Sequence, residues 1–373
     1  MNSQQLTMQN STIKLLRIIG SPFTHGHERP KTRNEALKLY KYATMNKIGF
    51  TYLESLKELK LLEELGLETK YREEQKKFEE QLVTAVRISK ILDSLNVDYV
   101  IFKSIMPFPA VQNDIDIIIF GSYNDYKTVI NGIAKLGYMD LRKVYADKIS
   151  NKQDAFTHQF HDPRNNAHKD FSAKDAYDFD IYQEVSLMDY MVYLDKKILR
   201  NYITTINLLN HQIKVLKPEA ELVTIIAHSI IKEQLFTLHT YYAVLHHLAK
   251  MNSNQIKDFV TIVGRSNVTK PVRACFSMIT EMHNLIHGFY PEKLTDIITI
   301  IGYEKRETKN LINKDLEVPY HYSVSLIAKT FLDITKESKV RKSILRQVKS
   351  MINLEGIKRI YKGFTSLRIR YTY

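Results

Sequence analysis

One short stretch restricts the fold of this chain more than any other. The segment "QNDIDIIIF", residues 112–120, places two carboxylates at alternating positions at the start of an apolar run. Its length and its Ile content are typical of a β-strand. Successive side chains of a strand point to opposite faces, so Asp114 and Asp116 share one face. Ile115 and Ile117 lie on the other face, and the sequence predicts that this apolar face packs in a core.

The segments around this run indicate which elements accompany the strand. "VDYVIFK", residues 97–103, is a second strand-like run, and a loop containing "PFP" joins the two. Amphipathic helical periodicity extends over about residues 34–95 and returns from residue 218 almost to the end. The helical segment "YNDYKTVINGIAKLG" follows the Asp-containing run. Further strands are expected at residues 138–145, 155–161 and 177–185.

The paired carboxylates call for a cation. Two carboxylates this close repel each other, and one takes up a proton unless a positive charge holds both ionised. Mg²⁺ meets this need, because it binds one or two carboxylates together with substrate phosphates. The pattern Asp-x-Asp is a weak signal by itself in a chain with 41 Asp and Glu residues. An Asp before a strand is also frequently a turn residue.

Two other segments strengthen the metal-site hypothesis. Lys103 and Ser104 end the preceding strand, where a small residue and a lysine can approach phosphate. Asp180, in the strand-like "YDFDIYQEV", offers a third acid. Three such carboxylates can form a two-metal site for an in-line displacement at phosphorus. Asp178 lies on the same face as Asp180 and is the competing third acid; Asp180 is preferred because apolar residues flank it as they flank Asp116.

The segment "VDYVIFKSIMPFPAVQNDIDIIIF" resembles the signature of nucleotidyltransferases of the DNA polymerase β superfold. In that signature a strand, a small-residue turn and an Asp-x-Asp strand are followed by a third acid. The segment is most similar to uncharacterised nucleotidyltransferases common in archaea, in which Lys-Ser/Thr-x-x-Pro-Phe-Pro precedes Asp-x-Asp. "FDIYQEVSLMDYMVYLDKKIL" resembles their third-carboxylate segment, and "NKIGFTYLESL" resembles their N-terminal helical part. The likeness covers roughly residues 34–250.

This resemblance implies an α+β fold, with a polymerase-β-like mixed sheet flanked by helices. It also implies transfer of a nucleoside monophosphate from an NTP to an acceptor hydroxyl, with release of pyrophosphate. Asp114, Asp116 and Asp180 are the implied catalytic residues and the ligands of Mg²⁺ or Mn²⁺. The superfold carries Gly followed by Ser or Gly at the turn, and this chain departs from it with Lys103 and Ser104. We expect both to contact the nucleotide.

The C-terminal helices of the family close over the nucleotide, which makes His228 and Lys232 candidates for binding the triphosphate. They are four residues apart on a predicted helix that continues to His239. A histidine among apolar residues is more often part of the core, and a lysine at this spacing is more often a surface charge.

The chain is expected to divide into four parts. These are an N-terminal helical segment (1–95), a nucleotidyltransferase core (96–205), a C-terminal helical domain (206–335), and a basic C-terminal helix and tail (336–373). The last part holds eleven Lys or Arg against two Glu, out of a net charge of +13 for the chain. Such a segment can follow a phosphate backbone, which favours an RNA acceptor such as a tRNA end. A solvated basic helix explains the composition equally well.

Other functions remain open at this stage. The chain can be a nucleotidyltransferase toxin of a toxin–antitoxin pair, or a nucleic-acid-binding protein with a degenerate catalytic core. The single cysteine, Cys275, cannot form an internal disulfide, and no apolar run is long enough to span a membrane, so a cytoplasmic protein is expected. The sequence does not indicate the oligomeric state.

Overall fold

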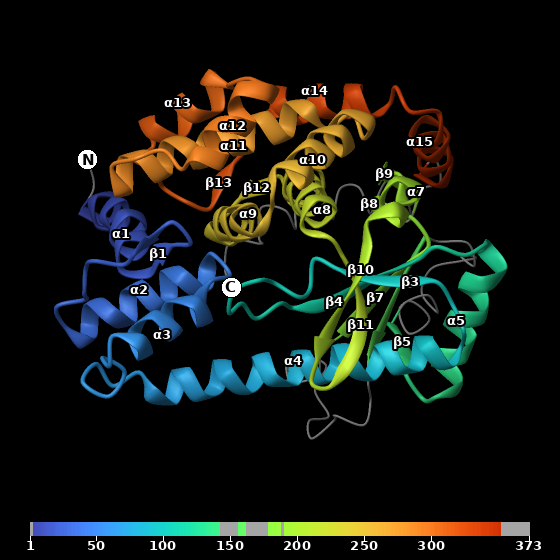
Figure 1. The fold of residues 1–373 in the computed structure, drawn as a ribbon, viewed down its shortest axis with the longest axis horizontal. Helices are drawn as coiled ribbons and strands as arrows, with labels where there is room; N and C mark the ends of the chain where they lie inside the picture. Colours follow the sequence, from blue (N-terminus) through green and yellow to red (C-terminus); the bar gives the residue numbers. More distant parts are fainter. Residues whose placement is uncertain (1–2, 142–155, 162–177, 188–189, 352–373) are drawn as a thin grey trace.

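The computed structural model describes residues 3–141, 156–161, 178–187 and 190–351. Its centre is a seven-stranded mixed sheet in the order β10-β11-β3-β4-β7-β6-β5, flanked by helices (Figure 1). The strands are β3 (Tyr99–Phe102), β4 (Asp114–Ile119), β5 (Met139–Asp140), β6 (Thr157–His161), β7 (Asp178–Tyr182), β10 (Ile203–Leu208) and β11 (His211–Leu216). The expected mixed sheet with flanking helices is therefore confirmed, and its assignment to the polymerase β superfold stays a prediction.

Two helices cover one face of the sheet. Helix α4 (Glu68–Ser94) runs along the molecule from the N-terminal helices to the sheet, and α5 (Tyr123–Lys135) lies beside it (Figure 1). Ile115 and Ile117 are fully buried in the cluster that these helices share with the sheet. The apolar face of β4 therefore packs as its alternation predicts. Helix α5 begins at a capping box formed by Ser122 and Asp125.

The C-terminal helices cover the opposite face of the sheet. Helix α8 (Pro218–Ile231) follows β11 directly and carries Pro218 in its first turn, where a missing N–H costs nothing. Val100, Phe102 and Ile118 point to this side and join a second core cluster. The helices that follow are α9 (Leu238–Lys250), α10 (Ser253–Arg265), α11 (Thr269–His287), α12 (Glu292–Ile301), α13 (Lys305–Asn313), α14 (Val324–Ile334) and α15 (Ser338–Met351).

The N-terminal helices pack on the C-terminal ones. Helices α1 (Ser3–Ile19), α2 (Arg33–Met45) and α3 (Gly49–Glu58) share the second core cluster with α8, α9 and α11. Asn46, which follows α2, is fully buried, and its side chain donates to Val318 O and accepts from Leu238 N, each at 3.2 Å. Residues far apart in the sequence therefore form one core.

The smaller elements complete the path of the chain. They are β1 (Gly20–Ser21), β2 (Thr24–His25), β8 (Val185–Leu187), β9 (Met191–Leu194), α7 (Lys196–Leu199), a 3₁₀ turn (Arg200–Tyr202), β12 (Leu235–Phe236) and β13 (Tyr320–His321). The hairpin of β10 and β11 spans residue 205, where the boundary between the core and the C-terminal helical domain was expected. Strand β11 of this hairpin pairs with β3. The sheet thus extends to Leu216, while the division into domains stays a prediction. No described helix is long and apolar enough to cross a membrane.

Candidate active site

Asp114, Asp116 and Asp180 come together on the sheet face that α8 covers. Strands β4 and β7 are parallel neighbours, and their register places Asp116 directly opposite Asp180. One carboxylate oxygen of each residue lies within 4.8 Å of those of the other two. Asp116 Oδ1 and Asp180 Oδ1 are buried and have no hydrogen-bond partner among the described residues. Unpaired buried carboxylate oxygens at this spacing fit a divalent cation.

The electrostatics of the three carboxylates also favour a cation. Burial and the charge of Asp116 raise the pKa of Asp114 to about 6. Burial, Asp116 and Asp114 raise the pKa of Asp180 to about 7. Burial acts on Asp116 in the same direction, but Lys103, Lys232 and His228 together outweigh it, so the pKa of Asp116 lies below its ordinary value. A bound cation would keep all three ionised at neutral pH.

Asp178, the alternative third acid, has other partners. It lies opposite Asp114 in the register of β4 and β7. Its Oδ1 is 2.8 Å from His161 Nδ1, and its Oδ2 accepts a hydrogen bond of 3.3 Å from Gln159 Nε2. The close group of three carboxylates contains Asp180 and not Asp178.

Lys103 supplies the nearest positive charge. Its backbone is left-handed (φ 57°), a conformation that Gly adopts without strain, and its N–H donates to Glu221 Oε1 at 2.5 Å. Its ammonium is 3.0 Å from Asp116 Oδ2 and 3.2 Å from His228 Nδ1. Burial acts to lower the pKa of Lys103, but Asp116, Tyr193 and Asp114 together outweigh burial and the pKa is raised. Lys103 is therefore an ammonium ion at the edge of the acidic group.

Ser104 has contacts within the turn. It is fully buried, its hydroxyl donates to Phe102 O at 2.9 Å, and the hydroxyl oxygen accepts from Asp116 N at 2.8 Å. It is not among the residues that line the pocket. These bonds fix the turn to the strand that carries the acids, and a direct contact of Ser104 with nucleotide stays a prediction.

His228 and Lys232 reach the site from the end of α8. His228 is half-buried; partial burial and Lys103 lower its pKa to about 4, so the neutral ring can accept a hydrogen bond at Nδ1 from the Lys103 ammonium. Lys232 Nζ donates to the hydroxyl of Tyr182 at 3.3 Å, and this hydroxyl donates to Asp180 Oδ2 at 3.3 Å. Both residues thus lie beside the acidic group.

The expectation of one helix from His228 to His239 is wrong. Helix α8 ends at Ile231, and Leu235–Phe236 pairs with Tyr320–His321 as a short antiparallel ladder. Gln234 adopts a positive φ of 55°, which a continuing α-helix does not allow. His239 therefore enters the site from α9.

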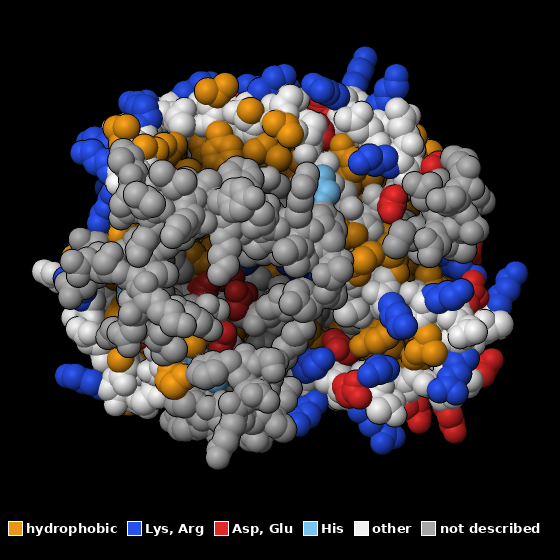
Figure 2. Space-filling view, turned by 180° about the vertical axis from the view of Figure 1, so that it is seen from behind, with side chains coloured by type: hydrophobic (Ala, Val, Ile, Leu, Met, Phe, Trp, Pro, Cys, Tyr) orange, Lys and Arg blue, Asp and Glu red, His pale blue; other side chains and the backbone are white. Residues whose placement is uncertain are grey.

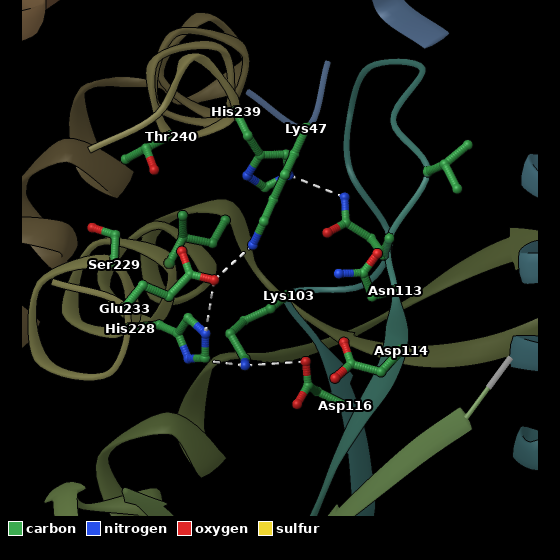
Figure 3. Close-up of a pocket in the computed structure, with 13 residues that line it drawn as sticks. Lys47, Lys103, Asn113, Asp114, Asp116, His228, Ser229, Glu233, His239 and Thr240 are labelled. Carbon is green, nitrogen blue, oxygen red and sulfur yellow. Dashed lines mark hydrogen bonds and ion pairs between the residues drawn. The ribbon is translucent and has the colours of Figure 1, made fainter. Parts of the chain in front are cut away.

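A cavity of about 70 Å³ lies between the acidic strand and helices α8 and α9 (Figure 3). Several polar residues of its wall were not among the residues predicted from the sequence. Gln112 and Asn113 immediately precede Asp114, so their position in the sequence could have indicated that they lie at the site. Local spacing gave no such signal for Lys47. The lining residues are Lys47, Lys103, Val111, Gln112, Asn113, Asp114, Asp116, Ile225, His228, Ser229, Glu233, His239 and Thr240.

Basic side chains are spread over the outside of the molecule. Figure 2 shows Lys and Arg side chains distributed around the periphery of the back face. Helix α15, the described part of the basic C-terminal segment, exposes Arg341, Lys342 and Lys349. Residues 352–373, which carry the rest of the predicted nucleic-acid-binding tail, lie outside the described residues.

Comparisons with known proteins add little to this geometry. No family model matches the chain, and no curated protein matches it. Among solved structures, the chain is similar to an antigenic nucleotidyltransferase-like protein from Paracoccidioides brasiliensis. The identity is 11%, the match covers 64% of this chain and 93% of that one, and the TM-score is 0.28. A similarity at this level does not establish a common function.

Proposed function

We propose that this chain is a metal-dependent nucleotidyltransferase. It would move a nucleoside monophosphate from an NTP to an acceptor hydroxyl and release pyrophosphate. The supporting observation is the convergence of Asp114, Asp116 and Asp180 from two parallel strands, with unpaired buried oxygens and a lysine at their edge. These residues would hold Mg²⁺ or Mn²⁺, hard ions that prefer carboxylate oxygen. When bound, such ions orient a triphosphate and acidify an attacking hydroxyl.

The side chains of the site have complementary tasks in this reaction. The acceptor oxygen forms a bond to the α-phosphorus while the bond from that phosphorus to the bridging oxygen breaks. Pyrophosphate leaves with the electron pair of the broken bond. Asp180, which a bound cation would keep ionised, accepts the proton of the acceptor hydroxyl. Lys103 and Lys232 balance the negative charge of the phosphates beside the acidic group.

We propose RNA, such as a tRNA end, as the acceptor. The support is the basic outer surface of α15, where Arg341, Lys342 and Lys349 are exposed. Such a surface binds a phosphate backbone through charge and without sequence preference. Binding that weakens steeply with added salt is the expected signature of this contact.

The position of the radioactive label in the NTP provides a direct test. The purified chain is incubated with Mg²⁺ or Mn²⁺ and with total cellular RNA, protein or metabolites as separate acceptors. Label at the α-phosphate should enter one acceptor fraction, and label at the γ-phosphate should leave as pyrophosphate. Asp116→Asn keeps the shape of the side chain and serves as the inactive control.

Two outcomes would contradict the proposal. Transfer of the γ-label would identify a phosphotransferase. Absence of transfer, together with absence of an NTP-dependent rise in Tm, would favour a degenerate nucleic-acid-binding protein. Growth arrest on expression, relieved in the Asp114, Asp116 and Asp180 triple variant, would instead indicate a toxin of the same enzyme class.

A further inference from the structure

Lys47 belongs to a different part of the chain from the rest of the pocket wall. Among the described residues of the N-terminal helices, it is the one that lines the pocket. It follows α2 in a left-handed conformation (φ 59°). The adjacent Asn46 anchors this turn: His239 N donates to Asn46 O at 3.1 Å, in addition to the bonds with Leu238 and Val318. A buried anchor therefore fixes the backbone of Lys47 at the start of α9.

The Lys47 side chain extends across the pocket toward Glu233 (Figure 3). Its ammonium donates to Glu233 Oε1 at 2.7 Å, and the same oxygen lies 3.8 Å from His228 Nε2. The Lys47 side chain is 42% exposed. Because it is at the open side of the pocket, the ammonium can exchange Glu233 for another anion without any rearrangement of the core.

The charge of Lys47 also reaches the acidic group. Burial and Asp116 raise the pKa of Asp114, and Lys47 is one of the lysines that oppose this rise. Lys47 and Asp114 line the same cavity. A polyphosphate held there through a cation at the carboxylates would have the Lys47 ammonium beside it.

We propose that Lys47 binds a phosphate of the donor nucleotide, and that Glu233 holds the Lys47 ammonium in place of phosphate until the nucleotide enters. This inference rests on the proposed function and adds a residue to its site. Glu233 is then a competitor of the phosphate for one ammonium. Removal of Lys47 should weaken polyphosphate binding, and neutralisation of Glu233 should strengthen it.

A purely structural ion pair predicts a different pattern. In that case Lys47 and Glu233 would only join the N-terminal helices to the end of α8. Loss of either partner would break the same contact, so both substitutions would affect the pocket in the same direction. Whether neutralisation of Glu233 strengthens or weakens polyphosphate binding therefore distinguishes the two explanations.

The test measures binding of inorganic tripolyphosphate to the full chain with Mg²⁺, by titration calorimetry. No transfer takes place, so the result does not depend on the acceptor. Lys47→Ala should raise Kd about tenfold, the loss of one charge-assisted contact. Glu233→Gln should lower Kd several-fold. Lys60→Ala is the matched control, because Lys60 is exposed and also has a left-handed backbone (φ 58°), and it should leave Kd unchanged.

Each result decides a different question. If Lys47→Ala binds tripolyphosphate as the wild type does, or if Glu233→Gln weakens binding as Lys47→Ala does, the inference is wrong and the proposed function still stands. If the wild type binds neither tripolyphosphate nor any NTP, the proposed function fails as well. Lys47→Met keeps most of the side-chain volume and replaces the alanine variant if that variant is unstable.

Discussion

Asp116 and Asp180 face each other across the parallel strands β4 and β7, and each keeps one buried carboxylate oxygen without a hydrogen-bond partner among the described residues. Such atoms destabilise a folded protein, because they lose their hydrogen bonds to water and form none within the protein. A structural role would be served better by neutral side chains. The arrangement is explained if these oxygens are ligands of a cation.

The first prediction concerns Asp180→Asn, which removes one charge and keeps the side-chain shape. Transfer should fall on the order of a thousandfold, since the proposed proton acceptor and a metal ligand are lost. The metal-free variant should have a higher Tm than the wild type, because repulsion among the carboxylates is relieved. Thermal unfolding with and without Mg²⁺ provides the measurement. A Mg²⁺-dependent rise in Tm as large as that of the wild type would exclude Asp180 as a ligand.

The second prediction concerns the buried ion pair of Lys103 and Asp116. Lys103→Met leaves the Asp116 carboxylate without its ammonium, and the metal-free protein should lose about 3 kcal/mol of stability. Mg²⁺ should stabilise this variant more than the wild type, because the ion replaces the missing positive charge. Urea unfolding at two Mg²⁺ concentrations tests this, with Lys60→Met as the control for a lost surface lysine. Equal stabilisation of variant and wild type would show that Mg²⁺ does not bind beside Asp116.

The third prediction is that the stability of the folded protein depends on pH through Glu221. Burial raises the pKa of this carboxyl to about 8, although it accepts the N–H of Lys103. Since the pKa is higher in the folded state, the native protein binds more protons than the unfolded chain at intermediate pH. This contribution to stability is therefore lost as pH rises from about 4 toward 8.

The Glu221→Gln variant isolates this effect. Gln keeps the acceptor for Lys103 N–H but cannot ionise, so the contributions of other titrating groups cancel in the comparison with the wild type. The two proteins should have similar stability at pH 5, and the variant should be the more stable at pH 9. Thermal unfolding at pH 5, 7 and 9 measures the difference, and a difference independent of pH would mean that Glu221 is ionised throughout.

The fourth prediction separates the two possible roles of Ser104. Its hydroxyl accepts Asp116 N–H, so Ser104→Ala should lower kcat by disturbing the strand that carries the acids, with little change in KM for NTP. The lost hydrogen bond should cost about 1 kcal/mol of stability. Steady-state kinetics decide the matter: a raised KM with unchanged kcat would indicate that the hydroxyl contacts the nucleotide instead.

The acids were predictable from the sequence because their signal is local. The alternation around Asp114 and Asp116 follows from strand geometry alone, and the same pattern recurs at Asp180. The pairing of β4 with β7, more than sixty residues later in the chain, is tertiary information that the local pattern does not contain. The apolar residues that flank Asp180 and the resemblance of its segment to a known signature together favour Asp180 over Asp178.

Other features depend on contacts that no local pattern encodes. Lys47 and Glu233 are 186 positions apart, and nothing in "MNKIGF" distinguishes this lysine from those on the surface. The helix expected to continue to His239 stops at Ile231, because Leu235–Phe236 pairs with Tyr320–His321, a segment distant in the sequence. Tertiary pairing there overrides the helical periodicity.

The last prediction concerns Gln81, a residue of α4 that joins the two ends of the loop between β3 and β4. It is buried; its Nε2 donates to Ser104 O at 2.6 Å, and its Oε1 accepts from Gln112 N at 2.9 Å. One side chain therefore sets the distance between the two ends of the loop. One end adjoins Lys103, and the other lies two residues before Asp114.

Gln81→Leu should remove the hydrogen-bond partner of the buried Ser104 O and of the half-buried Gln112 N, and cost about 3 kcal/mol. It should also lower kcat up to about a hundredfold, since displacements near 1 Å are enough to misalign reacting groups. Gln75→Leu, at a half-buried position on the same helix whose amide donates to Glu79 and not to the loop, is the control and should change neither quantity. Urea unfolding and transfer rates are measured on both variants. A Gln81→Leu protein that is less stable but transfers nucleotide at the wild-type rate would contradict this prediction. It would show that the hydrogen bonds of Gln81 stabilise the fold but do not position the acids for transfer.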